Sequence, residues 1–141
     1  AQFVILLIFV LLSLLSDGLS SYMKDYIGRI KPHVTFVNPL WKEYKPALSL
    51  PSNHAMNTAF QCFYLWSFLQ ILSGHKQWMI FFCFLFPMSL LVAYSRIVLG
   101  QHYPIDVSVG WLIGSVLGFS IGALVAKQLK KFLKIQFIHP D

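Results

Sequence analysis

The sequence has few charged side chains, and this scarcity is its most restrictive feature. Only 11% of the 141 residues are Asp, Glu, Lys or Arg, whereas 57% are hydrophobic. A soluble domain carries about a quarter charged residues. The composition therefore excludes an ordinary soluble protein and predicts a membrane protein, and the length allows one domain over residues 1–141.

Acidic residues and cysteines are also scarce. There are 5 Asp and Glu against 11 Lys and Arg, which gives a net charge of +6. No nucleic-acid-binding motif accompanies this excess, so we expect an anionic substrate and anionic membrane lipid as partners, and no nucleic acid. The two cysteines, Cys62 and Cys83, lie inside apolar runs and predict no disulfide.

Long apolar runs predict an all-α fold, a polytopic bundle of transmembrane helices. A bilayer core about 30 Å thick needs roughly 20 mostly apolar residues. Four segments meet or approach this length, at residues 2–23, 54–72, 77–95 and 104–126. The first lacks the preceding positive charges of a signal peptide and is interpreted as a membrane helix. Residues 127–141 are predicted to form a basic amphipathic helix on the cytoplasmic surface.

Proline and glycine occupy distinctive places in the last two spans. Pro87 is predicted to kink the third span. In the fourth span a glycine recurs once per helical turn, at Gly110, Gly114, Gly118 and Gly122. Such a stripe lets another helix approach closely, and packing inside the bundle is expected ahead of dimerisation.

Polar residues gather on one face of the predicted bundle. Alternate crossings bring the end of the first span, the start of the second, the end of the third and the start of the fourth to the same side. The residues concerned are Lys24, Lys31, Ser52, His54, Arg96, His102 and Asp106. Buried or interfacial charges in membrane proteins are costly and usually functional, so this convergence predicts a site.

The chemistry of this set indicates a phosphate site. Three cations around two histidines repel one another unless an anion lies among them, and arginine and lysine both bind phosphate well. Ser52 and Asn53 are suitable N-cap residues for the second span, and Pro104 suits the first turn of the fourth. Two helix N-termini would then point toward the same anion.

His102 and Asp106 lie four residues apart at a predicted helix start. The aspartate can accept a hydrogen bond from one imidazole nitrogen and leave the other nucleophilic. His54 could then protonate a leaving oxygen. This predicts phosphoryl transfer without a metal or another cofactor, because the cations neutralise the developing charge. The two histidines and the carboxylate could instead bind a metal, which the nearby cations disfavour.

Three segments resemble the motifs of a known family. "SRIVLGQHYPID" fits S-R-x5-H-x3-D, "PSNH" resembles P-S-G-H, and "KDYIGRIKP" resembles K-x6-R-P. In this order they resemble the motifs of the type 2 phosphatidic acid phosphatases, integral-membrane lipid phosphatases that share a site with the vanadium haloperoxidases. The resemblance implies a six-helix core, of which the four spans would be the last four, and no metal requirement.

The resemblance also implies a role for each matching residue. His102 would be the nucleophile that forms a phosphohistidine, Asp106 its orienting partner and His54 the general acid. The phosphate ligands would be Lys24, Lys31, Ser52, Asn53, Ser95 and Arg96.

Two positions depart from the family pattern. Lys31 stands in place of arginine, so bidentate phosphate contact is lost there, and Arg29 is expected to sit elsewhere on a helix. Asn53 stands in place of glycine and is expected to bulk the turn, although asparagine tolerates unusual backbone angles. Together they predict weakened rather than abolished activity.

The leading hypothesis is a phosphatase acting on a lipid phosphate or diphosphate in the bacterial cytoplasmic membrane. The predicted substrates are lipid A 1-phosphate, phosphatidylglycerol phosphate, undecaprenyl diphosphate or phosphatidic acid. The site face would carry six Lys and Arg and the opposite face five. Three of the six belong to the site, which leaves three free charges against the five on the opposite face. By the positive-inside rule the opposite face is then cytoplasmic, and the site faces the periplasm or exterior.

Three alternatives use the same features. A lipid-to-lipid phosphotransferase would need the same residues, and a catalytically weak protein would bind the anion or lipid without turnover. A small transporter or channel component would need polar residues through the membrane depth. The sequence predicts no oligomeric state.

Overall fold

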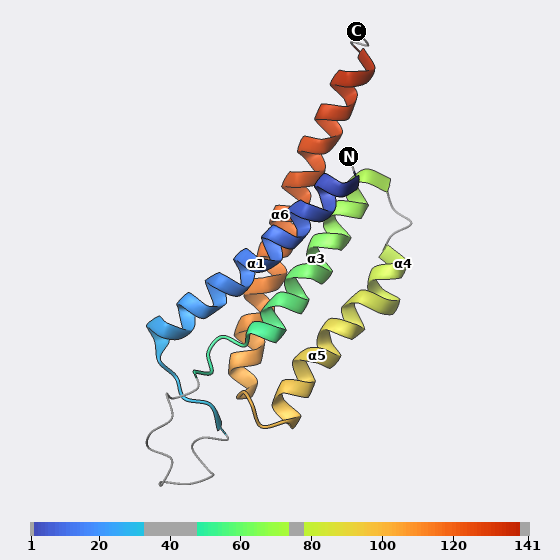
Figure 1. The fold of residues 1–141 in the computed structure, drawn as a ribbon. Coiled ribbons are helices and arrows are strands. Elements are labelled where there is room, and N and C mark those ends of the chain that lie inside the picture. The colour runs from blue at the N-terminus through green and yellow to red at the C-terminus, as the bar shows by residue number, and fades with distance from the viewer. Residues whose placement is uncertain (1, 33–47, 74–77, 139–141) are drawn as a thin grey trace.

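The computed structural model describes residues 2–32, 48–73 and 78–138, and within these ranges it is helical with no strand. Three long helices are α1 (Gln2–Ile27), α3 (Asn53–Ser73) and α6 (Pro104–Ile138). A further helical stretch comprises α4 (Trp78–Ile80), the π-helix η2 (Phe81–Leu85) and α5 (Phe86–Val98). The predicted all-α bundle is confirmed (Figure 1).

Two described helical segments are long and apolar enough to cross a membrane, Phe81–Val98 and Pro104–Phe132. They overlap the third and fourth predicted spans. α1 and α3 overlap the first and second predicted spans. The crossing of the membrane by α1 and α3 stays a prediction, as does the six-helix core.

The glycine stripe of α6 packs inside the bundle, as predicted, and its partner there is α3. A Cβ atom added at Gly114 or Gly118 would overlap the backbone carbonyl oxygen of Met56 or Phe60 on α3. At Gly110 the added atom would lie 2.8 Å from the carbonyl oxygen of Ser52. This close backbone approach makes α3 and α6 the most extensively packed pair of helices in the described ranges.

α3 is the central helix of the bundle. Its Phe60 and Tyr64 side chains are buried together with Ala126 of α6. α1 and α5 also contact α3, and Figure 1 shows them on either side of it with α6 behind. Residues two apart on a helix point in nearly opposite directions. The face of α3 opposite Met56 and Phe60 is therefore turned away from α6.

A kink was predicted at Pro87, and the helix is irregular in the turn just before this proline. Residues Phe81–Leu85 form a π-helical turn, and the Phe86 amide donates to the Phe81 carbonyl five residues earlier. Proline lacks an amide hydrogen, and its ring crowds the carbonyl four residues back. A widened turn is one way in which a helix accommodates such a residue.

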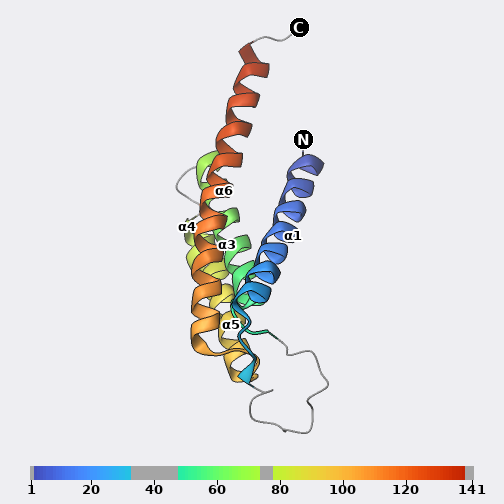
Figure 2. The same cartoon turned by 90° about the vertical axis from the view of Figure 1, so that its left-hand side faces the viewer.

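One helix runs across the predicted boundary between the fourth span and a surface helix, and where its membrane-spanning part ends stays a prediction. α6 continues without a break to Ile138, and Figures 1 and 2 show its last turns extending past the other helices. Residues 127–138 contain no glycine or proline and several strong helix formers, so nothing interrupts the helix. Residues 139–141 of the predicted tail lie outside the described residues.

Candidate active site

The motif segments meet at one end of the bundle. α1 and α5 end there and α3 and α6 begin there, at the lower end of Figures 1 and 2. Contacts between distant segments fix the arrangement. Arg29 Nη1 lies 2.8 Å from Asp106 Oδ1, and Ser49 Oγ lies 3.3 Å from His102 Nδ1. These contacts bring the segment after α1 and the segment before α3 together with the start of α6, and the site roles of the motif residues stay a prediction.

The chain leaves α1 at Gly28, which has a φ of 67°. A left-handed glycine is a common helix stop, and here its amide donates to the Lys24 carbonyl over 2.8 Å. Beyond it, Ile30 pairs with Leu48 in an isolated antiparallel bridge. Arg29 therefore lies in a short extended segment beyond the helix, so its expected position on a helix is wrong.

Arg29 contacts both Asp106 and Tyr103. Its guanidinium carbon lies 4.5 Å from the centre of the Tyr103 ring, and its Nη1 forms the ion pair with Asp106. The Asp106 side chain is fully buried, at 0% exposure, and a buried carboxylate needs such compensation. The Tyr103 amide donates to the other carboxylate oxygen over 3.0 Å.

Ser49 connects His102 to Asp106. Its hydroxyl donates to Asp106 Oδ2 and also lies within reach of His102 Nδ1. Because a hydroxyl has one proton, donation to the carboxylate leaves the serine oxygen as acceptor for Nδ1–H. This arrangement places the imidazole lone pair on Nε2. In the described part of the chain the contact expected directly between His102 and Asp106 thus runs through Ser49.

His102 is held in the turn before α6 and is only 4% exposed. Its amide donates to the Arg96 carbonyl over 3.3 Å. Burial, together with the positive charges of Lys24 and Lys31, lowers the pKa of His102 to about 4. The imidazole is therefore neutral near neutral pH, as a nitrogen nucleophile must be.

Two predicted phosphate ligands carry buried polar atoms that have no hydrogen-bond partner in the described structure: Ser52 Oγ and Arg96 Nε. Elsewhere these residues are well anchored. The Ser52 amide donates to the Asp106 carbonyl over 3.1 Å, and Arg96 Nη1 donates to Gln101 Oε1 over 3.1 Å. An unsatisfied buried polar group costs about 1–3 kcal/mol. Both groups are hydrogen-bond donors of the kind from which an anion accepts.

His54 lies in the first turn of α3 and is exposed. The positive charges of Arg96, Lys24 and Lys31 lie close enough to act on its imidazole. Lys24 and Lys31 also act on His102. All three predicted cations thus act on His54 and two of them act on His102, which is the electrostatic arrangement expected of an anion site.

Asn53 directs its side chain toward α1. Its amide nitrogen donates to Asp17 over 3.0 Å, and its oxygen accepts a hydrogen bond from Ser20. No non-glycine residue in the described ranges has a positive φ, so asparagine takes this position without left-handed strain. The Asn53 side chain was expected to add bulk at the phosphate-binding turn, but it contacts α1 instead.

Ser95 also uses its hydroxyl elsewhere, because that group donates to the Val92 carbonyl over 2.7 Å. The side chains of Asn53 and Ser95 therefore have partners other than a phosphate in this structure. Within the described ranges, no three His, Cys, Asp or Glu side chains are grouped to hold a metal ion.

Sequence reasoning missed two site residues, Ser49 and Arg29. Ser49 is a fully buried serine between Leu48 and Leu50, just before the PSNH segment, and a lone polar residue there was the available signal. Arg29 was visible as an additional cation in the first motif, but its geometry depends on where α1 ends.

Comparison with known proteins agrees with the motifs. The PAP2 superfamily matches residues 4–131. An undecaprenyl-diphosphatase of Sulfolobus acidocaldarius is 33% identical over 103 residues, which cover 72% of this chain and 46% of the relative. Phosphatidylglycerophosphatase B of Bacillus subtilis is 32% identical over 118 residues, which cover 81% of this chain and 54% of the relative.

The chain spans about half the length of the curated relatives it matches. No solved structure matches it. The family match nevertheless includes all three motif segments and most of the described helices. The chain therefore belongs to the PAP2 superfamily.

Proposed function

We propose that the protein is a membrane lipid phosphatase that hydrolyses a phosphate monoester or diphosphate through a phosphohistidine on His102. The observation that carries this proposal is the pair of unpartnered buried groups, Ser52 Oγ and Arg96 Nε, on two residues whose backbones bond the catalytic segment. The His102 amide donates to the Arg96 carbonyl, and the Ser52 amide donates to the Asp106 carbonyl. Membership of the PAP2 superfamily and the phosphatase names of both relatives support it.

In the first step, Nε2 of His102 attacks phosphorus and the bond from phosphorus to the lipid oxygen breaks. The departing oxygen takes the bonding electron pair and a proton from His54. The imidazole gains positive charge as its nitrogen bonds to phosphorus. Asp106 stabilises that charge through Ser49, while Lys24, Lys31 and Arg96 offset the phosphoryl charge.

In the second step, water attacks the phosphohistidine. Neutral His54 accepts a proton from the water, and the electrons of the nitrogen–phosphorus bond return to Nε2. Inorganic phosphate leaves, with His102 neutral and His54 protonated again. The cycle is balanced with these residues, and we propose that it needs no metal.

Phosphate release is the first test, measured in detergent with a chelator on a panel of lipids. The panel comprises lipid A, phosphatidylglycerol phosphate, undecaprenyl diphosphate and phosphatidic acid. We expect release by wild type and by Lys127→Ala, an exposed matched control on α6, and none by His102→Ala. Equal release by His102→Ala would show that His102 is not the nucleophile. No release by wild type would reject the proposed phosphatase activity.

The role of His54 is tested with the leaving group. His54→Ala should slow hydrolysis of a lipid phosphate by about 10²–10⁴-fold, the usual contribution of general acid catalysis. It should slow para-nitrophenyl phosphate much less, because that leaving group departs without protonation. Equal losses on both substrates would remove His54 from the acid role.

We further propose that the site faces the periplasm or exterior. This orientation rests on the numbers of Lys and Arg on the two faces of the bundle. Those numbers include Lys42, Lys45 and Lys76, which lie outside the described residues. In a variant with Cys62 and Cys83 replaced by alanine, a cysteine at Tyr26 should react with an impermeant maleimide in intact cells. A cysteine at Gln128, at the other end of the bundle, should be protected. The reverse pattern would overturn the orientation.

A further inference from the structure

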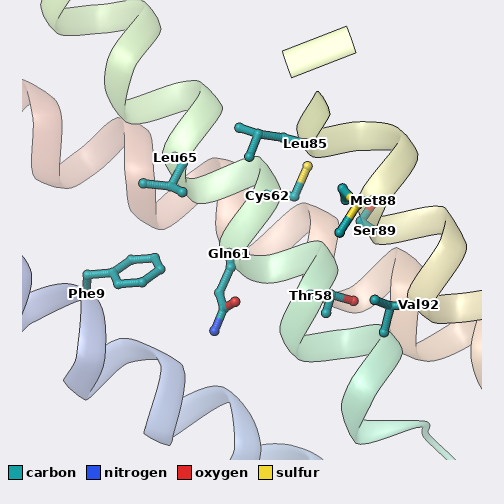
Figure 3. A pocket seen from close by; sticks show the side chains of 9 residues that line it. All are labelled: Phe9, Thr58, Gln61, Cys62, Leu65, Leu85, Met88, Ser89 and Val92. Carbon is teal, nitrogen blue, oxygen red and sulfur yellow. The ribbon is translucent and has the colours of Figure 1, made fainter. Parts of the chain in front are cut away.

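A groove lies along the face of α3 that is turned away from α6. Its volume is about 210 Å³. Figure 3 shows Thr58 of α3 and Val92 of α5 at one end, and Leu65 of α3 and Leu85 of η2 toward the other. Seven residues of helix separate Thr58 from Leu65, which corresponds to about 10 Å.

The lining of the groove is mainly apolar, and its polar members have partners inside the protein. The Thr58 hydroxyl donates to the His54 carbonyl over 2.7 Å. Gln61 donates to Ser13 Oγ of α1 over 3.5 Å, a long contact. Ser89 donates to the Phe86 carbonyl and accepts from Trp111. These groups leave methyl and methylene surface as the main contact for an occupant.

Both walls of the groove lead to the active-site end. On α3, Thr58 follows His54 by four residues, and residues four apart share a helix face. On α5, Arg96 follows Val92 by four residues in the same way. His54 and Arg96 are themselves close enough for the arginine charge to act on the imidazole. The groove therefore begins one helical turn from two residues of the phosphate site.

We propose that this groove holds the apolar alkyl or prenyl chain of the lipid phosphate substrate, an inference that rests on the proposed phosphatase function. The leaving oxygen is bonded to the chain-bearing part of the substrate and must lie beside His54. The lipid chain cannot run from His54 between α3 and α6, because Gly114 and Gly118 bring the two helix backbones into contact. The α3 face between α1 and α5 leaves room, and its apolar lining suits hydrocarbon.

The proposal predicts chain-dependent effects of filling the groove. Val92→Trp should lower kcat/KM for dioleoyl phosphatidic acid and farnesyl diphosphate by about tenfold or more. It should leave hydrolysis of para-nitrophenyl phosphate, which has no chain, unchanged. The matched control is Leu91→Trp on the same helix, where Leu91 is 61% exposed and does not line the groove. The control should leave all three substrates unaffected.

Each other result has a distinct meaning. An equal loss on chain-bearing and chainless substrates, or no loss on either, would overturn the groove as the chain site. Failure of wild type to hydrolyse any of the three, together with no release from the four-lipid panel, would reject the proposed function itself. Thermal unfolding of both tryptophan variants in detergent shows whether each is folded.

Cross-linking tests the same site without turnover. An alkyl phosphate with a diazirine in mid-chain should label His102→Ala on residues 58–65 and 85–92. The corresponding alkyl alcohol should label these residues much less. Equal labelling by the alcohol would mean that the groove takes general membrane lipid, and labelling confined to other segments would mean that another part of the protein covers it. Either result would overturn the proposal.

Discussion

Ser49 Oγ lies 3.3 Å from His102 Nδ1, and the same hydroxyl donates a hydrogen bond to the Asp106 carboxylate. This relay determines which imidazole nitrogen carries hydrogen. It also lets a buried negative charge act on His102 across an intervening group. The segment that carries Ser49 is fixed in turn, because the Ser49 amide donates to the Arg29 carbonyl over 2.6 Å.

Ser49→Ala should lower kcat by about 10- to 100-fold, by analogy with the loss seen when the hydrogen-bond partner of a metal-ligating histidine is removed. KM should change little, because Ser49 is assigned no phosphate contact. Steady-state hydrolysis of phosphatidic acid measures both constants, with Ser120→Ala on the exposed face of α6 as control. A rise in KM at constant kcat would assign Ser49 to substrate binding instead.

Arg29→Ala should destabilise the fold, because it leaves the Asp106 carboxylate buried with one fewer partner. Loss of a charged hydrogen-bond partner costs about 1.5–3 kcal/mol, and the 37% exposure of Arg29 favours the lower end. Arg29→Lys keeps the charge but loses the flat contact with Tyr103, so a smaller loss is expected. Denaturant unfolding in detergent measures both, and equal stability of Arg29→Ala and wild type would contradict the ion pair's role.

The helical class and the gathering of the motifs could be predicted from the sequence, because both follow from apolar run lengths and alternate crossings. The packing of Gly114 and Gly118 inside the bundle followed from their spacing by one turn. These features repeat regularly along the chain, so they need no tertiary information.

The finer geometry of the site could not be predicted in this way. The placement of Arg29 depends on the end of α1 at Gly28, which has a left-handed φ. Arg29 was expected on a helix, and that expectation fails because the helix ends before it. The role of Ser49 arises from a contact over 53 positions of sequence. The direction of the Asn53 side chain depends on Asp17 and Ser20, which belong to a different helix.

Asn53→Gly, which would match the family motif more closely, should destabilise this protein. Asn53 has no positive φ, so glycine relieves no strain, while the contacts to Asp17 and Ser20 on α1 are lost. A hydrogen bond contributes about 0.5–1.5 kcal/mol, and glycine adds backbone entropy to the unfolded chain. The midpoint of thermal unfolding should fall; a higher midpoint would show that Asn53 is strained.

Two glycine-to-alanine substitutions should have opposite effects. Gly114→Ala places a Cβ against the Met56 carbonyl and should separate α3 from α6, which lowers stability. Gly18→Ala meets nothing within 4 Å, so it should stabilise α1 by about 0.5–1 kcal/mol through helix propensity. Unfolding of both variants in the same detergent tests the pair, and a neutral Gly114→Ala would contradict the close helix approach.

Stability should depend on pH through His102. Burial and the nearby lysines lower its pKa to about 4 in the folded protein, against about 6.5 in an unfolded chain. Between these values the unfolded state binds a proton that folded His102 does not bind. The free energy of unfolding should therefore fall as pH decreases from about 6.5 to 4, and the full contribution should be present above 6.5.

His102→Asn should remove this part of the pH slope, because asparagine does not titrate. Histidine ring NMR gives the direct measurement, with the His102 signal assigned as the one missing from the variant. In folded wild type that ring should remain neutral at pH 5, where an unperturbed histidine is mostly protonated. Titration of the His102 signal near 6.5 would show that its imidazole is well solvated, and the buried position of His102 beside the lysine charges would then be contradicted.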